Sequence, residues 1–152
     1  MPNPKTKYVH TNLVAKNWKS LAKFYIDVFG CTLKPPERNL KGKWLDDVTS
    51  VRNAHIKGIH LYLPGFGSDG PTLEIFQYPN VSNRSAHKIN HPGFTHIAFS
   101  VKNVQEVLDK VIRNGGSKIG KVVRANIQGA GEIEFVYSCD PEGNIIELQK
   151  WK

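Results

Sequence analysis

The sequence predicts an α+β fold built from two βαβββ modules in tandem. Segments with strand-like alternation and helical periodicity follow in the order strand, helix and three strands, and the same order then recurs. The two halves also align, because Tyr8-Val9-His10 corresponds to Phe94-Thr95-His96 at an offset of 86 residues. This repetition indicates an internal duplication. Each helix-backed sheet has a second face that must be packed or occupied, so we expect the two sheets to curve around a central cavity.

The chain length agrees with a single domain. A chain of 152 residues, with 39% hydrophobic and 22% charged residues, has the composition of one globular domain. We expect that domain to span residues 1–152, with a first module over about 7–78, a linker over 79–92 and a second module over about 93–150.

The first module is expected to begin with a strand over Lys7–Val14 and a helix over Asn17–Phe29. The helix has one apolar stripe, formed by Trp18, Leu21, Phe24, Tyr25 and Val28. Gly30 follows it where a left-handed residue is favoured. Three further strands are predicted at about Trp44–Val51, Lys57–Leu63 and Thr72–Tyr78.

The second module repeats this order. A strand over Phe94–Val101 precedes a helix over Asn103–Asn114, in which Asn103 and Glu106 have the spacing of a capping box. The apolar stripe of this helix consists of Val104, Val107, Leu108, Val111 and Ile112. The remaining strands are predicted at about Lys121–Ile127, Glu132–Ser138 and Asn144–Lys150, and the last two are joined by the tight-turn sequence Asp140-Pro141-Glu142-Gly143.

The formal net charge of +8 is concentrated in the first part of the chain. Residues 1–60 hold 11 Lys and Arg against 4 Asp and Glu. These cations occur singly and are not clustered among aromatic residues, so the sequence does not predict a nucleic-acid partner. A small anionic substrate is compatible with the charge. Arg38, Lys41 and Lys43 are the candidate contacts for such an anion, but we expect these three cations to be solvated charges on a loop.

Neither a membrane segment nor a secretion signal is predicted. No apolar run approaches the roughly 20 residues of a bilayer span, and the first residues lack a signal peptide's apolar region. Cys31 and Cys139 form no CxxC motif, which is typical of reduced thiols in a cytosolic protein. We therefore expect a cytoplasmic protein.

Strand alternation predicts a metal site. In each module a His on the first strand and a Glu on the last strand lie on the face opposite the apolar one, and these four residues are His10, Glu74, His96 and Glu147. Two imidazoles and two carboxylates suit a divalent ion such as Zn, Ni, Co, Mn or Fe. Neighbours of the same parity are candidate substrate contacts: Tyr8, Asn12, Phe76, Phe94 and Gln149. The histidines without a counterpart in the other module are expected to be surface or packing residues: His55, His60, His87 and His91.

The motifs that carry these residues resemble the vicinal oxygen chelate superfamily, which includes glyoxalases, bleomycin resistance proteins and extradiol dioxygenases. His10 lies in KYVHTNLV, Glu74 in PTLEIFQY, His96 in GFTHIAFSV and Glu147 in DPEGNIIEL. The resemblance covers about residues 7–150. The His/Glu/His/Glu set is similar to that of glyoxalase I, and methylmalonyl-CoA epimerases have His/Gln/His/Glu.

The resemblance implies a metal-dependent lyase, isomerase or epimerase that stabilises an enediolate or enolate of a small oxygenated or thioester substrate. Glu147 is then the first candidate for the catalytic base, with Glu74 opposite it. An Fe(II) extradiol-type dioxygenase is an alternative, although its His/His/Glu triad would place His at position 74. A non-catalytic, resistance-type binding protein is another. Relatives usually dimerise, so a homodimer is expected. Glutathione recognition departs from the resemblance, because Leu13 and Val14 stand where an arginine is expected.

Overall fold

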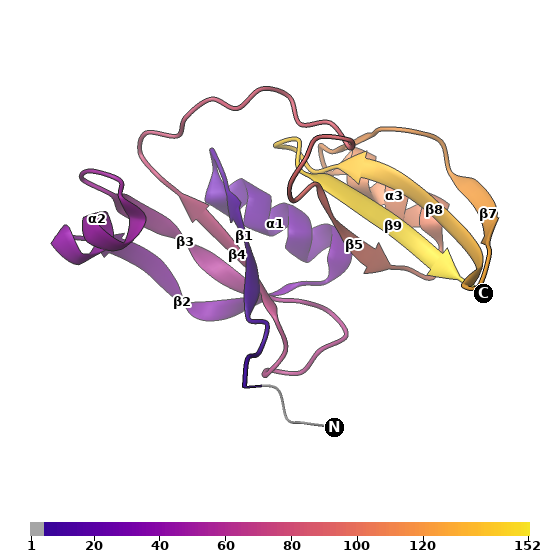
Figure 1. Cartoon of the computed structure of the whole chain (residues 1–152), viewed down its shortest axis with the longest axis horizontal. Coiled ribbons are helices and arrows are strands. Elements are labelled where there is room, and N and C mark those ends of the chain that lie inside the picture. The colour runs from indigo at the N-terminus through magenta and orange to yellow at the C-terminus, as the bar shows by residue number, and fades with distance from the viewer. Residues whose placement is uncertain (1–4) are drawn as a thin grey trace. The chain divides into compact units, whose positions relative to one another are not determined.

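The computed structural model describes residues 5–152 and confirms the α+β class (Figure 1). The chain divides into two compact units, the first ending at Ser82 and the second beginning at Asn83. Each unit contains one sheet, with a helix against it. No helix in the described part of the chain is both long enough and apolar enough to cross a membrane.

The first unit contains a four-stranded sheet in the order β1-β4-β3-β2. Its elements are β1 (His10–Val14), α1 (Trp18–Phe29), β2 (Thr32–Lys41), α2 (Lys43–Thr49), β3 (His55–Tyr62) and β4 (Thr72–Gln77). Strands β1 and β4 are parallel, whereas β3 is antiparallel to both of its neighbours. The first and last strands of this unit therefore lie side by side.

Helix α1 covers one face of this sheet. Its whole predicted stripe is buried, and Leu73 and Ile75 of β4 are buried on the alternate positions of their strand. The Asn17 side chain accepts a hydrogen bond from the Ser20 amide, and Gly30 ends the helix with φ 73°. Because Leu73 and Ile75 belong to the helix-covered face, Glu74 between them points to the opposite face.

The segment after α1 differs from the prediction. The expected strand over Trp44–Val51 is wrong, because Lys43–Thr49 forms the helix α2, in which Lys43 and Asp47 pair one helical turn apart. The segment before it, expected to be a loop, forms the strand β2. Pro35 and Pro36 argue against a central strand, but β2 is an edge strand, and its pairing with β3 shifts register between Lys34 and Arg38.

The second unit contains β5 (His96–Ser100), α3 (Val104–Arg113), β6 (Ser117–Lys118), β7 (Val123–Ile127), β8 (Gly131–Cys139) and β9 (Ile145–Trp151). The strand order is β5-β9-β8-β6, and β7 also pairs with β8. The first and last strands, β5 and β9, are again parallel neighbours. Helix α3 lies against β8 and β9, as Figure 1 shows.

The helix stripe, helix cap and tight turn predicted for the second unit are found in the structure, with one exception in the stripe. Val104, Leu108 and Val111 of the predicted stripe are buried, whereas Ile112 is exposed. The Asn103 side chain accepts a hydrogen bond from the Glu106 amide, as the capping spacing predicts. The buried Asp140 carboxylate accepts hydrogen bonds from the amides of Glu142 and Asn144, which fixes the turn between β8 and β9.

Candidate metal site and adjoining pocket

Each unit brings together one histidine and one glutamate on parallel neighbouring strands. In the first unit, β1 and β4 place His10 Nε2 3.6 Å from Glu74 Oε1. In the second, β5 and β9 place His96 Nε2 3.1 Å from Glu147 Oε2. The glutamate side chains are 11% and 13% exposed. Each predicted His therefore lies beside the predicted Glu of its own module, while a single site formed by all four residues stays a prediction.

In the first unit, Glu74 belongs to a row of polar side chains across the sheet. The strand register aligns Asn12 with Glu74, Glu74 with His60, and His60 with Lys34. Asn12 Nδ2 donates a hydrogen bond of 2.9 Å to Glu74 Oε1, and His60 Nε2 lies 2.7 Å from Glu74 Oε2. Both carboxylate oxygens thus have a polar neighbour, which fixes the direction of the carboxylate on a nearly buried side chain.

His60 differs from its predicted surface or packing role. Its side chain is 12% exposed, and its Nδ1 lies 2.9 Å from the hydroxyl oxygen of Thr72. His10, His60 and Glu74 each offer one ligand atom, and these atoms all lie within 4.8 Å of one another. The His10 and His60 rings meet edge to face at 5.5 Å. No local sequence pattern marks His60, because its position beside Glu74 depends on the register of β3 against β4.

The second unit has different residues at the corresponding positions. Tyr137 of β8 pairs with Glu147, as His60 pairs with Glu74, and Ala98 stands where the first unit has Asn12. The Tyr137 ring lies 5.2 Å from the His96 ring, edge to face. Burial raises the pKa of Tyr137, and the charge of Glu147 raises it further. This half therefore presents one imidazole, one carboxylate and a protonated phenol.

The chemistry of these donors fits a divalent metal. Imidazole nitrogen and carboxylate oxygen bind Zn²⁺ at about 2.0–2.2 Å, so ligand atoms in one coordination shell lie roughly 3–3.5 Å apart. The His10–Glu74 and His96–Glu147 separations are close to that range. Burial lowers the pKa of His60, against the opposing effect of Glu74, while Arg38, His10 and Lys34 lower it further. A lowered pKa favours the neutral imidazole, which is the form that binds a metal.

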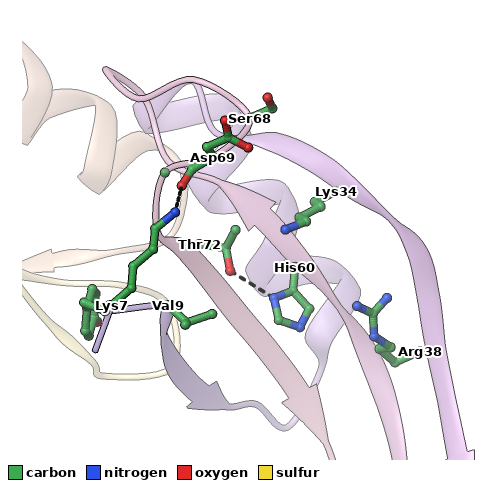
Figure 2. A pocket seen from close by; sticks show the side chains of 10 residues that line it. Lys7, Val9, Lys34, Arg38, His60, Ser68, Asp69 and Thr72 are labelled. Atoms are coloured by element: carbon green, nitrogen blue, oxygen red, sulfur yellow. Dashed lines mark hydrogen bonds between the residues drawn. The ribbon is translucent and has the colours of Figure 1, made fainter. Parts of the chain in front are cut away.

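A pocket of about 270 Å³ adjoins His60 in the first unit (Figure 2). Its walls come from the residues before β1, from β2 and β3, and from the loop that leads into β4. Charged and ionisable side chains are prominent among them: Lys7, Lys34, Arg38, His60 and Asp69. Arg38 therefore lies on a strand and lines a pocket, and is not the solvated loop charge expected from the sequence. Lys43 instead forms an ion pair on α2, with its Nζ 2.6 Å from Asp47 Oδ2.

The predicted substrate contacts of the first unit take different positions. Tyr8 lines the pocket, and its hydroxyl is hydrogen-bonded to Thr11. Asn12 instead holds Glu74. Phe76 packs against the apolar cluster beneath α2, and its ring lies 6.1 Å from that of His60. The substrate-binding role of these residues stays a prediction.

The two predicted contacts of the second unit lie in different surroundings. Phe94 precedes β5 and is fully exposed. Gln149 is half-buried on β9, and its Oε1 accepts a hydrogen bond of 2.6 Å from Trp151 Nε1. Gln149 shares the face of Glu147 on β9 by strand alternation. The contact of Phe94 and Gln149 with a substrate stays a prediction.

Comparison with known proteins agrees with this architecture. The sequence matches the family model of the glyoxalase/bleomycin resistance protein/dioxygenase superfamily over residues 7–148. A glyoxalase family protein from Bacillus cereus is similar in structure, with a TM-score of 0.82 and 17% identity over 99% of this chain and 97% of the other. One from Enterococcus faecalis has a TM-score of 0.59 and 21% identity, covering 98% and 99%. No curated protein matches the chain.

Proposed function

Because the chain belongs to the glyoxalase/bleomycin resistance protein/dioxygenase superfamily, we propose that it is a metal-dependent lyase, isomerase or epimerase of glyoxalase type. Its substrate would be a small oxygenated compound or a thioester. One observation carries the proposal: both units place a histidine beside a glutamate on parallel first and last strands. A duplicated pair of this kind supplies two imidazoles and two carboxylates.

We propose His10, Glu74, His96 and Glu147 as the residues that hold the metal. A bound divalent ion would supply Lewis-acid polarisation of substrate oxygens, which makes a proton on the neighbouring carbon more acidic. The carboxylates of this chain then provide the base for that proton. His96 is the ion-pair partner of Glu147, whereas His10, His60 and Asn12 all contact Glu74. The less constrained carboxylate moves more readily, so Glu147 is the first candidate base and Glu74 the second.

Metal content tests this proposal directly. Purified protein would be stripped with a chelator, dialysed, reloaded separately with Zn²⁺, Ni²⁺, Co²⁺, Mn²⁺ or Fe²⁺, and subjected to elemental analysis. We expect one ion per chain, and at least tenfold weaker binding in His10→Ala and Glu147→Gln. His55→Ala is a matched control, because His55 contacts Asn39 and lies outside the His10–His60–Glu74 group. Absence of stoichiometric metal under every loading condition would overturn the proposal.

The reaction class needs a separate assay. Exchange of solvent deuterium into methylglyoxal hemithioacetal or methylmalonyl-CoA is expected from an enzyme that removes a proton from carbon. Glu147→Gln should lose most of this exchange while His55→Ala retains it. Stoichiometric metal without exchange or turnover would instead favour a non-catalytic binding protein.

A second candidate, an Fe(II) extradiol-type dioxygenase, is favoured by one feature of the first unit. His10, His60 and Glu74 form a group of two histidines and one carboxylate, a combination typical of non-haem iron oxygenases. Fe(II)-loaded protein would then consume oxygen in the presence of a catechol, and His60→Ala would abolish that consumption. Deuterium exchange without oxygen consumption would exclude this candidate.

A further inference from the structure

The pocket beside His60 carries an excess of positive charge. Lys7, Lys34 and Arg38 line it, against a single acidic side chain, Asp69. The Lys7 amine donates a hydrogen bond of 2.9 Å to the backbone carbonyl of Asp69. Figure 2 shows Lys34 and Arg38 on the same side of the pocket as His60, across from Lys7. Two cations from one strand therefore face the same small space as His60.

Neither Lys34 nor Arg38 has a carboxylate partner among residues 5–152. The Lys34 amine lies 5.5 Å from the centre of the Tyr62 ring. The Arg38 guanidinium donates to the carbonyl of Pro36, which uses only part of its five N–H donors. Both groups thus keep donors available, and a guanidinium with an ammonium nearby is a combination that binds oxyanions by charge-assisted hydrogen bonds.

The position of this pair relates it to the candidate metal site. Lys34 pairs with His60 across β2 and β3, and His60 pairs with Glu74 across β3 and β4. Adjacent strands lie about 4.8 Å apart, so Lys34 is two strands from Glu74. A small molecule with its anionic group at Lys34 and Arg38 would extend past His60 toward Glu74. The volume of about 270 Å³ suits a compact molecule.

We propose that the pocket binds an oxyanion, the carboxylate or phosphate group of a small substrate, through Arg38 and Lys34. The assignment of that ligand as the substrate rests on the proposed function, whereas binding of an oxyanion to the pocket does not require a metal. The inference gives the substrate class: a compact anionic molecule whose other end carries the reacting oxygens.

The test uses the full chain without metal, labelled with ¹⁵N and titrated with sodium phosphate, sodium glycolate or neutral ethylene glycol at constant ionic strength. We expect saturable shifts of the amides of His60 and Thr72 with at least one anion and none with the glycol. Saturation by glycolate alone would assign a carboxylate, and saturation by phosphate alone would assign a phosphate.

Variants locate the binding. Arg38→Gln and Lys34→Gln should each raise the dissociation constant at least tenfold, and Arg38→Lys should retain part of the affinity. Lys41→Gln is the matched control, because Lys41 is an exposed cation on the same strand outside the pocket. Unchanged shifts of the helix α1 amides, which belong to the same unit but lie outside the pocket lining, show that each variant is folded. Equal weakening by Lys41→Gln and Arg38→Gln, or no saturable binding by either anion, would overturn the inference.

The result is independent of the metal measurement. Oxyanion binding without any metal binding would refute the proposed function and leave the pocket assignment standing. Metal binding without oxyanion binding would refute the pocket assignment alone.

Discussion

Replacing Thr72 with valine removes the hydroxyl beside His60 and keeps the shape of the side chain. Thr72 is 3% exposed, and its Oγ1 lies 2.9 Å from His60 Nδ1. A buried hydrogen bond contributes about 1 kcal/mol net, and leaving its partner unsatisfied costs about 1–3 kcal/mol. Because valine restores some apolar burial, we expect the free energy of unfolding of the first unit to fall by about 1–2 kcal/mol.

Urea unfolding followed by tryptophan fluorescence measures this change. Trp18 and Trp44 lie in the first unit and Trp151 lies in the second, so the signal follows the unfolding of both units. Thr95→Val is a matched control, because the Thr95 hydroxyl lies 3.0 Å from His96 Nδ1 at an exposed position. That control should change stability by less than about 0.5 kcal/mol.

A double-mutant cycle attributes the loss to the Thr72–His60 contact. Thr72→Val and His60→Phe, measured singly and together, should show a coupling energy of about 1 kcal/mol. Additivity of the two changes to within about 0.3 kcal/mol would refute the assigned hydrogen bond. Equal losses in Thr72→Val and Thr95→Val would refute the effect of burial.

Two other outcomes follow from the first unit. Burial lowers the pKa of His60 below its ordinary 6.5. As the pH is lowered below 6.5, the unfolded chain therefore takes up this proton before the folded chain does. The free energy of unfolding of the metal-free protein should then decrease by at most about 1.4 kcal/mol for each unit by which the pH is lowered, from this group. His60→Asn should flatten that dependence between pH 7.5 and 5.5, and an unchanged slope would contradict it. Gly58→Ala should destabilise the sheet by about 1–3 kcal/mol in urea unfolding, because the added Cβ would lie 2.0 Å from the Ile75 carbonyl oxygen; wild-type stability would show that the strands separate freely there.

Several features of the fold could be predicted because their causes are local. Asn17 and Asn103 cap the first turn of their own helices, and Gly30 ends α1 with a left-handed conformation. The alternation in β4 and β9 likewise depends on the strand alone, so the face of Glu74 and Glu147 could be assigned in advance. The error at α2 has a local cause as well, since Leu45 is the buried residue of this short helix while Trp44 and Val48 are exposed, so it lacks the apolar stripe that marks α1 and α3.

The sequence by itself therefore determined the duplicated βαβββ order and the presence of a His and a Glu on the first and last strand of each module. Only the tertiary structure decided which side chains meet those residues. His60 has no counterpart in the other module, where Tyr137 stands, and its contact with Glu74 depends on the exact pairing of β3 with β4. A shift of one residue in that register would turn His60 to the other face of the sheet. The positions of Lys34 and Arg38 depend in the same way on the pairing of the edge strand β2 with β3. That pairing is a long-range property of the chain, and Pro35 and Pro36 make the segment look unlike a strand in the sequence.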